Sequence, residues 1–563
     1  MRRAGNRKPF ATGIAFAGLL AGVCHAAPSN DNWASRAAIG ALPFTETVET
    51  IEQATTETTD PLLYCVNAGY PTQGVNTVWY EFTTGATEQF VDIEAGDYDS
   101  LLAVFAGSPA DGFTMVRGGC NDDDPFFKSK LVGLRLAANT RYSIVVAVYP
   151  PFADPSMTLT FSMKTATIYT VTKTDDTADG ICDADCSLRE AVAQSEQAPG
   201  AIIVPAGTYV VPGGLTATRA GAIYGAGMRA TVIKGQGDGH VLTHSASDRL
   251  TYALHDLTLS GGSVPADDIL FRASGGAFNA GYGYFTLDRV ALLDSHATAG
   301  NGGGASFWYG TSASIYDSVV TGNTTGGEGG AIHFYGANLE VQASTIAGNK
   351  ASTGGGVHML GAFGVRLLDT TVSGNEAAGD VGGVHIGAGY PSRRIVINNS
   401  TIVNNTAGSV PSAQNGGLQF VNSAVSHFPP VVTNTVLSGN HLSSDPAVIF
   451  DCGAPDGFAI RSGYNLVQAP NGCTFAASGN VTGVDPQLLP LSTYGTIPVH
   501  VPADSSPLID AGDPGDSCER TDARGVVRPV DGDVDGTSRC DIGAVEKTGP
   551  GEGGDTLFAD SFE

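Results

Sequence analysis

Basic residues are scarce in this chain. Its 563 residues include 29 Lys and Arg against 56 Asp and Glu, which leaves a formal net charge of −27. This balance excludes nucleic acid as the main partner, because phosphate binding needs clusters of basic residues. Charged residues of both signs make up only 15% of the chain, against roughly 25% in typical globular proteins. The chain is therefore acidic but carries few charges in total.

Long apolar runs are missing beyond the first residues, so no later segment is predicted to cross a membrane as a helix. At the start, four basic residues within positions 1–8 precede an apolar run over 11–23 and small residues at 26–27. This order is typical of a secretory signal peptide. A membrane anchor is the alternative, but the run is shorter than the ~20 residues that a span needs. We expect residues 1–27 to be a signal peptide and the mature chain to be secreted.

Glycine is the clear excess, with 75 residues, about twice the usual share of ~7%. The glycines lack a strict three-residue period and prolines number only 29, which excludes a collagen. Apolar residues make up 42% of the chain, which excludes a disordered one. The composition suits many short strands joined by tight turns.

Eight cysteines remain after the signal segment, and an even number in an exported chain predicts disulfides. They form four pairs that are local in the sequence. We predict the bonds Cys65–Cys120, Cys182–Cys186, Cys452–Cys473 and Cys518–Cys540. Zinc is the alternative at the C-D-A-D-C segment (182–186), which lacks a second cysteine pair or nearby histidines.

Residues 28–165 contain short alternating strands separated by turn clusters, which predicts a β-sandwich. The segments NDNWASRAAI (30–39), NTVWYEFT (76–83) and YDSLLAVFAGS (98–108) resemble the pre-peptidase C-terminal (PPC) type of domain of secreted bacterial proteins. The resemblance implies a jelly-roll accessory module that has no catalytic residues of its own.

Residues 168–200 contain one helix start. Ser187 and Glu190 have the spacing of a capping box, in which each side chain hydrogen-bonds the backbone of the other residue. The text CSLREA (186–191) resembles the CSLREA domain of exported bacterial proteins. Because a solenoid must cover the apolar end of its core, we expect this segment to be a helical cap.

From about residue 201 the sequence repeats. The short segments GASF, AIHF, GVHM and GVHI begin at 304, 331, 356 and 383, about 25–27 residues apart, which fits one three-strand coil each. The repeat predicts a right-handed parallel β-helix of the pectin-lyase-like class over 201–485. Roughly ten coils at ~4.8 Å each would give a rod of about 50 Å.

Residues 486–546 carry prolines, aspartates and the last cysteine pair. The segments YNLVQAPNGC (464–473), SSPLIDAGDP (505–514) and RCDIGAVE (539–546) resemble the "choice-of-anchor" ending of bacterial β-helix surface proteins. The resemblance implies a place at the bacterial cell surface or outer membrane. Residues 547–563 are expected to be a linker with a sorting tail, or a frayed terminus.

One outward row of the β-helix stands out. Ile332 and Phe334 are apolar and predicted to point into the core, and the period of two sends the residue between them outward. Stacked strands place the equivalent residues of successive coils ~4.8 Å apart. We therefore predict a polysaccharide-binding strip. This outward row consists of Ser306, Trp308, His333, Tyr335, His358, His385 and Gln419. A solvated polar face and a metal site are the alternatives.

A second series, here called the corner series, places Asp or Asn at one corner of successive coils. Its members are Asp256, Asp288, Asp317, Asp369, Asn399 and Asn434. Short polar side chains at such corners hydrogen-bond the backbone of turns, so a structural role is predicted. The same role is predicted for the G-N series Asn323, Asn349, Asn375 and Asn440.

Signs of catalysis are few. A β-helix hydrolase needs two or three converging carboxylates, and a lyase needs a cation or an arginine beside a base. Asp288 and Asp317, on neighbouring coils with Arg289 adjacent, are the best pair for such a role. A G-x-S-x-G motif with its strand–turn–helix context is missing.

The alternation Asp531, Asp533, Asp535 followed by Gly536 predicts a calcium loop, because hard carboxylate oxygens suit a hard cation. Position twelve of this loop is Ile542 instead of Glu, so an EF-hand is not expected. The acidic run at 122–124 is a second, weaker calcium candidate.

Taken together, the sequence favours a non-enzymatic, adhesin-like protein, secreted or anchored at the surface, that binds polysaccharide as a monomer. Its alternative is a polysaccharide lyase or glycoside hydrolase of the pectate-lyase-like class. Fold analogy alone supports this alternative, and a fold does not fix a function.

Overall fold

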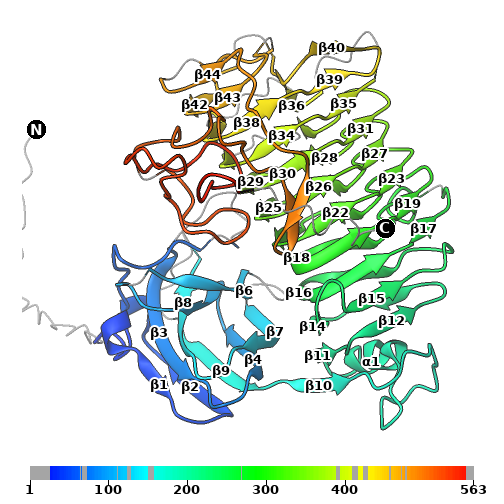
Figure 1. Cartoon of the computed structure of the whole chain (residues 1–563). Helices are drawn as coiled ribbons and strands as arrows, with labels where there is room; N and C mark the ends of the chain where they lie inside the picture. Colours follow the sequence, from blue (N-terminus) through cyan, green and yellow to red (C-terminus); the bar gives the residue numbers. More distant parts are fainter. Residues whose placement is uncertain are drawn as a thin grey trace, which may run out of the picture.

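The computed structural model describes residues 26–552, except 64, 66–72, 111, 123–127, 150–156, 268, 388–393, 409–415, 422–428, 456–457, 471, 476–477 and 516. Residues 1–25 of the predicted signal segment and the acidic residues 123–124 lie outside this part. Among the described residues, no helix is long and apolar enough to cross a membrane. Two bodies lie side by side, a β-sandwich and a tall stack of parallel strands (Figure 1).

The β-sandwich has two facing sheets. One contains β1 (Ala37–Ile39), β3 (Val75–Thr83), β8 (Arg141–Val148), β5 (Ser100–Ala106) and β6 (Thr114–Asp122). The other contains β2 (Phe44–Val48), β9 (Leu159–Thr165), β4 (Gln89–Gly96) and β7 (Ser129–Leu136). Alternate residues of both sheets meet in one core, where the rings of Tyr80 and Phe161 stack with their centroids 3.9 Å apart. The predicted sandwich is therefore present. Two 3-10 turns accompany it, Trp33–Ser35 and Ile51–Gln53.

A single short α-helix, α1 (Leu188–Ser195), follows β10 (Thr167–Thr170) in the described chain. The Ser187 hydroxyl accepts a hydrogen bond from the Glu190 amide, and the Glu190 carboxylate accepts one from the Ser187 amide, as the capping box predicts. Leu188, Ala191 and Val192 are buried in the same core as the first coils. The helix therefore covers the apolar end of the stack, at the bottom of Figure 1.

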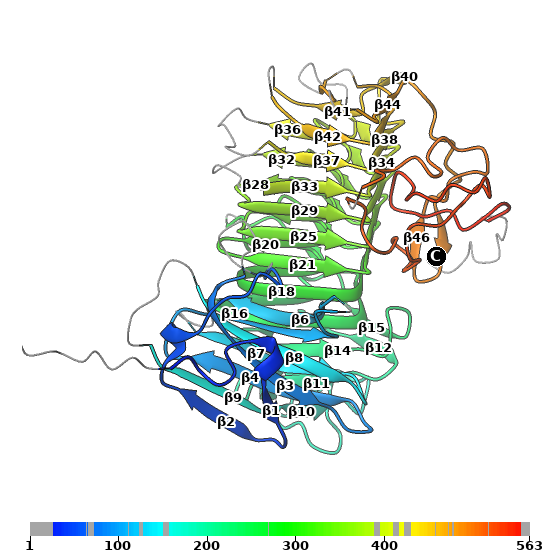
Figure 2. The same cartoon turned by 90° about the vertical axis from the view of Figure 1, so that its left-hand side faces the viewer.

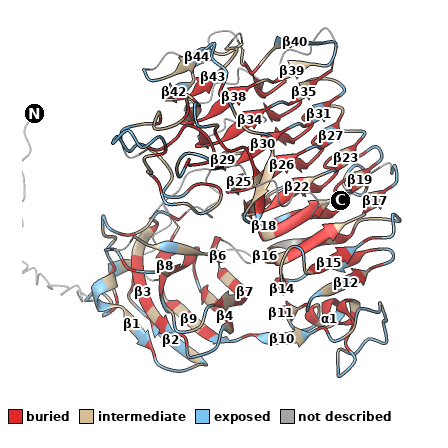
Figure 3. Ribbon diagram, in the orientation of Figure 1, coloured by how far each residue is buried: buried red, intermediate tan, exposed pale blue. Residues whose placement is uncertain are grey.

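The stack is a parallel β-helix, which confirms the predicted fold class. The first coils are built from β11 (Gly200–Ile203), β12 (Gly207–Val210), β13 (Leu215–Ala217), β14 (Gly221–Tyr224), β15 (Thr231–Lys234), β16 (Leu242–Ser260), β17 (Ser263–Val264), β18 (Phe278–Leu293) and β19 (His296–Ala297). Figure 2 shows the strands of successive coils lying one above another. Figure 3 shows that buried residues run along the whole stack.

Each of the next coils holds three longer strands and one of two residues. The first strands are β20 (Ala305–Trp308), β24 (Ile332–Phe334), β28 (Val357–Leu360), β32 (Val384–Gly387) and β36 (Leu418–Val421). The second are β21 (Ser312–Tyr316), β25 (Asn338–Gln342), β29 (Gly364–Leu368), β33 (Arg394–Asn398) and β37 (Val431–Thr433). The third are β22 (Val319–Thr321), β26 (Thr345–Ala347), β30 (Thr371–Ser373), β34 (Thr401–Val403) and β38 (Val436–Ser438). The two-residue strands are β23 (Thr324–Thr325), β27 (Lys350–Ala351), β31 (Glu376–Ala377), β35 (Thr406–Ala407) and β39 (His441–Leu442).

The repeated glycines ahead of each first strand have a steric reason. A Cβ atom on Gly330 would lie 2.2 Å from the carbonyl oxygen of Gly355 on the next coil. Only glycine lets the backbones of adjacent coils approach this closely. The apolar residues of the following strand then point inward, and the Phe307 ring contacts those of Phe278 and Phe334 within the core.

The last coils and the C-terminal region complete the molecule. Their strands are β40 (Asp445–Ile449), β41 (Cys452–Gly453), β42 (Arg461–Gly463), β43 (Leu466–Val467), β44 (Val481–Thr482), β45 (Ser492–Tyr494) and β46 (Ile497–Val499). The region after β44 folds back along the flank of the β-helix, as Figures 1 and 2 show in orange and red. There Arg528 pairs with Asp369 of the β-helix at 3.3 Å.

All four predicted disulfides are confirmed. The Cα–Cα distances of the bonded pairs are 5.8, 4.3, 5.6 and 6.5 Å, in chain order. The short loop between Cys182 and Cys186 closes just ahead of the helix α1. This bond leaves no free thiolate there for zinc.

Candidate active site

An open groove with a cavity volume of about 90 Å³ lies where β6 of the sandwich faces the second strands of the β-helix. Its charged lining residues are Arg117, Glu340, Arg366 and Arg394, and its aromatic lining residues are Tyr284, Phe285 and Tyr316. Hydroxyl and amide groups of Thr286, Ser312, Ser314 and Asn338 also line it. The groove is thus lined by charged groups and by neutral hydroxyl and amide groups.

The register of the β-helix explains this lining. Ala313 and Ile315 of β21 lie in the core, so Ser314 between them points outward into the groove. Ser314 pairs with Glu340 of β25, which pairs with Arg366 of β29. Three consecutive coils therefore present a hydroxyl, a carboxylate and a guanidinium in one row. The sandwich adds Arg117, which lies on β6.

Charges in the groove are paired across coils and across the two bodies. Arg366 Nη1 donates to Glu340 Oε1 at 3.0 Å. The Arg117 guanidinium lies 3.6 Å from the centroid of the Tyr316 ring and 3.8 Å from the Asp317 carboxylate. Burial raises the pKa of Asp317, and the Arg117 charge opposes this rise only in part. Burial raises the pKa of Tyr316 to about 12, so its hydroxyl stays protonated at neutral pH.

The corner series differs from its predicted register at one position. Arg289, with a φ of 52°, takes the left-handed corner that Asp256 and Asp317 occupy on the neighbouring coils, with φ angles of 57° and 48°. Asp288 lies one residue earlier, within β18, in register with His255 and Tyr316. The predicted alignment of Asp288 with Asp317 was therefore wrong by one residue. A sequence pattern of small polar residues does not fix the register of a strand, so it does not determine which residue occupies the corner.

Asp288 is a buried anchor of the interface with the sandwich. Its Oδ2 lies 3.1 Å from His255 Nδ1 and 2.9 Å from Arg289 Nη1. Arg289 also pairs with Asp256 at 2.6 Å, and Arg135 of the sandwich pairs with Asp256 at 2.7 Å. These contacts occupy Asp288 and Arg289, whereas Asp317 is half-buried and lies near the groove residue Arg117.

The outward row points away from the core, as predicted, but most of it is covered. Ser306, Trp308, His333 and His358 are buried, and His385 is only 9% exposed. Phe271 packs edge-on against Trp308, and the Ser306 hydroxyl lies 3.3 Å from His333 Nδ1. Tyr335 and Gln419 are half-buried. A continuous exposed strip is therefore not formed, because side chains and turns outside the stack pack over the row.

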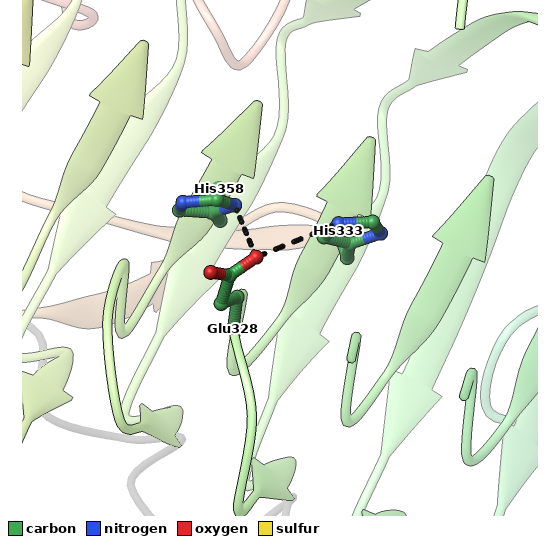
Figure 4. Close-up of side chains that lie close together, drawn as sticks. All are labelled: Glu328, His333 and His358. Atoms are coloured by element: carbon green, nitrogen blue, oxygen red, sulfur yellow. Dashed lines mark ion pairs between the residues drawn. The ribbon is translucent and has the colours of Figure 1, made fainter. Parts of the chain in front are cut away.

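Burial also sets the charge of the histidines in this row. It lowers the pKa of His333 to about 3, of His358 to about 2 and of His385 to about 4. All three imidazoles are therefore neutral at pH 7. The Glu328 carboxylate lies between two of them, 3.9 Å from His333 Nε2 and 3.3 Å from His358 Nδ1 (Figure 4).

The predicted calcium loop is partly assembled. Carboxylate oxygens of Asp531 and Asp533 lie within 4.8 Å of one another and of Asp510, which the sequence analysis did not single out. The Asp535 carboxylate instead accepts a hydrogen bond from the Thr537 amide. Asp510 lies 21 residues before Asp531 and has no sequence signal of its own, since the fold alone brings the two segments together.

The groove residues were missed for different reasons. Arg117 belongs to another domain, and only docking of the sandwich places it here. Glu340 and Arg366 occupy the same outward position of successive coils, 26 residues apart in the chain. The recurrence of charged residues at this outward position of the second strands could have indicated the site from the sequence. Glu328 lies in a turn of low complexity, where no pattern distinguishes it.

Comparisons with known proteins give little at the level of sequence. No family model matches the chain, so its PPC-type and CSLREA resemblances stay predictions. No curated protein matches it either.

Solved structures of parallel β-helix proteins resemble it. The catalytic domain of a GH87 α-1,3-glucanase in complex with tetrasaccharides is 14% identical, over 78% of this chain and 95% of that chain, with a TM-score of 0.24. The GH87 α-1,3-glucanase from Streptomyces thermodiastaticus is 13% identical, over 78% and 98%, with a TM-score of 0.20. The A-module of a mannuronan C-5 epimerase from Azotobacter vinelandii is 18% identical, over 57% and 100%, with a TM-score of 0.21. At these identities the likeness concerns the fold alone.

These comparisons correct the first functional interpretation. The sequence favoured a non-enzymatic, adhesin-like protein, whereas the matched structures are glucanase catalytic domains and an epimerase module. The non-enzymatic interpretation is withdrawn. Neither a substrate nor a catalytic residue carries over, so the chemistry must be argued from the groove.

Proposed function

We propose that the protein is a glycoside hydrolase that cleaves an acidic polysaccharide in the groove between β6 and the second strands of the β-helix. One observation carries this proposal. Three guanidinium groups and the Glu340 carboxylate line one open groove, and the Asp317 carboxylate lies beside it, 3.8 Å from Arg117.

The guanidinium groups suit a negatively charged sugar chain. Arg394 is exposed at the groove, and Arg117 and Arg366 line it beside their carboxylate partners. Guanidinium groups bind carboxylate and sulfate groups with paired hydrogen bonds. The chain as a whole carries a net charge of −27, so an acidic polymer is repelled elsewhere and attracted here.

The two carboxylates differ in environment, as acid and base do in hydrolysis. Burial raises the pKa of Asp317, which favours its protonated form. Asp317 would give its proton to the glycosidic oxygen as the bond from that oxygen to the anomeric carbon breaks. Glu340, held by Arg366 at 3.0 Å, would take a proton from the water that attacks the anomeric carbon. One water is consumed, and one new reducing end forms per bond.

The test is a panel of uronate-containing, sulfated and neutral polysaccharides, read for new reducing ends and for unsaturated products. We expect reducing ends from an acidic polymer. Glu340→Gln and Asp317→Asn should each lower kcat by about 100-fold or more, the usual contribution of an acid or base. Arg394→Ala should raise KM and leave kcat nearly unchanged, because it binds substrate without touching the cleaved bond.

The control is Glu376→Gln, since Glu376 is an exposed carboxylate on β31, outside the groove. Its activity should equal that of the wild type. Unsaturated products would show that the polymer is cleaved by elimination and not by hydrolysis, which would overturn the proposal. Absence of turnover on the whole panel would overturn it too.

We infer the cellular setting from the sequence. The signal-like residues 1–27 support export, and the choice-of-anchor resemblance supports a place at the bacterial surface. A calcium ion at Asp531 and Asp533, with Asp510 as a further ligand, stays a prediction. So does the monomeric state.

A further inference from the structure

Two imidazoles and one carboxylate converge on one point outside the core of the β-helix, on a different face from the groove (Figure 4). His333 lies on β24 and His358 on β28, at paired positions of adjacent coils. Glu328 lies in the turn ahead of β24. One ligand atom of each residue lies within 4.8 Å of the others. We propose that Glu328, His333 and His358 bind a divalent transition-metal ion.

Hydrogen bonding does not account for this cluster. Glu328 Oε2 lies 3.9 Å from His333 Nε2, which is too long for a hydrogen bond. His358 Nδ1 is buried and has no hydrogen-bond partner among the described residues, and the same holds for His385 Nδ1 on the next coil. Buried polar atoms in proteins are nearly always paired. A cation would give these nitrogens the partner that the described chain does not.

The spacing of the ligand atoms fits one shared ion. Zinc–nitrogen and zinc–oxygen bonds are about 2.0–2.2 Å long, so two ligands of a tetrahedral ion lie roughly 3.3–3.6 Å apart. Glu328 Oε2 and His358 Nδ1 are 3.3 Å apart, and the distance to His333 Nε2 exceeds this range by a few tenths of an ångström. The Glu328 side chain is 39% exposed, which gives an ion a way in and room for a small shift.

The repeat of the β-helix builds the site and extends it. His385 follows His358 on the next coil, with ring centroids 4.3 Å apart. Asp380 precedes His385 by the same five residues that separate Glu328 from His333, and its Oδ1 is also buried without a hydrogen-bond partner in the described part of the chain. Polar side chains therefore continue beyond the three proposed ligands onto the next coil. A tetrahedral ion held by three ligands would have its fourth coordination position free for water.

The donor set selects the class of ion. Two neutral imidazoles and one carboxylate suit Zn²⁺, Co²⁺ or Ni²⁺, whereas Ca²⁺ and Mg²⁺ prefer oxygen ligands alone. The acidic loop around Asp531 lacks histidine and belongs to the second class. The two sites can therefore be told apart by the metal that each one takes.

The test is calorimetric titration of untagged, chelator-treated full-length protein with ZnCl₂, with Co²⁺ absorption as a spectroscopic signature of imidazole ligation. We expect one Zn²⁺ per chain at this site, and tetrahedral Co²⁺ bands. Glu328→Gln and His358→Gln should each weaken Zn²⁺ binding by more than about tenfold. His296→Gln is the matched control, since His296 is a half-buried histidine of β19 that hydrogen-bonds Thr324.

Glu328→Gln keeps the test interpretable if a histidine variant fails to fold, because Glu328 is half-exposed and its amide replacement preserves shape. Circular dichroism of each metal-free variant checks the fold. Absence of Zn²⁺ heat and of Co²⁺ bands would overturn the proposal. Binding that survives unchanged in Glu328→Gln and in folded His358→Gln would overturn it too. Hydrolysis in the groove is read separately, so either proposal can fail alone.

Discussion

At the scale of the residue, Glu190 shows how one carboxylate ties the cap to the loop before it. It accepts hydrogen bonds from the amides of Ser187 and Asp179 and from the Thr177 hydroxyl. These bonds, that of the Ser187 amide first, lower its pKa to about 2 from 4.5. The charged carboxylate thus joins the helix start to the loop over 177–179.

This pKa shift predicts an acid-sensitive cap. A group with a lowered pKa in the folded state stabilises the fold above its unfolded pKa, and that stability is lost as the pH falls through the folded pKa. We expect the contribution of Glu190 to be complete above about pH 4.5 and lost by about pH 2. Glu190→Gln should lower the melting temperature at pH 7. It should also make the melting temperature fall less than that of the wild type between about pH 4.5 and about pH 2.

Melting followed by circular dichroism across this pH range measures the effect. Glu88→Gln, an exposed carboxylate of the sandwich, is the control and should behave like the wild type. Equal pH dependence in the wild type and Glu190→Gln would contradict the assignment.

At the scale of the element, an asparagine ladder holds the coils in register. Its members are Asn323, Asn349, Asn375, Asn405 and Asn440. Each side chain donates to backbone carbonyls and to the side-chain oxygen of the next member, and the last donates to Asp451. All five members are buried. The ladder satisfies turn groups that water cannot reach, and therefore fixes where each third strand ends.

Removal of one ladder side chain should cost more than removal of a surface contact. Asn349→Ala removes the acceptor of the Asn323 amide and takes one hydrogen bond each from the Asn323 side chain, two carbonyl groups and Asn375 Oδ1. Each unsatisfied buried group costs about 1–3 kcal/mol, so we expect a loss of roughly 3 kcal/mol or more. Urea unfolding measures it, with exposed Thr298→Ala as the control. A loss below about 1 kcal/mol would mean that water replaces the side chain.

At the scale of the whole molecule, two long-range contacts join three parts of the chain. Arg135 of the sandwich lies 4.7 Å from the Tyr224 ring centroid and pairs with Asp256 of the β-helix. On the same stack, Arg528 of the C-terminal region pairs with Asp369 and with Glu546 at 2.8 Å. The first contact joins the sandwich to the first coils, and the second holds the C-terminal region against the later coils.

The Arg528 contact predicts a large effect from one substitution. Arg528, Asp369 and Glu546 are all buried. Burial raises the pKa of both carboxyl groups, and the Arg528 charge opposes that rise. Arg528→Met removes the charge and leaves the two carboxyl groups buried, at a cost of about 3–5 kcal/mol.

Limited proteolysis and urea unfolding measure this loss. Cleavage should begin in the C-terminal region, which is released from the coils. Arg461→Met, an exposed arginine on β42, is the control and should leave both measurements unchanged. Unaltered stability of Arg528→Met would show that the region is held by its apolar contacts alone.

The sequence by itself determined the repeating architecture. Glycine pairs, apolar triplets and Asn residues recur at one coil length, and local sterics and period-two alternation turn them into stacked strands. The helix start at Ser187 and the Cys182–Cys186 disulfide were equally local, because each depends on residues close together in the chain.

Only the tertiary structure decided which side chains meet. Asp288 and Arg289 differ by one residue along a continuous strand, and packing against Arg135 and His255 selects which of them takes the corner. The histidines point outward as alternation predicts, yet their burial depends on turns that cover them from other coils. The groove needs Arg117 from a separate domain. Such contacts join residues that are distant in sequence, and a local pattern carries no information about a partner that docking brings to it.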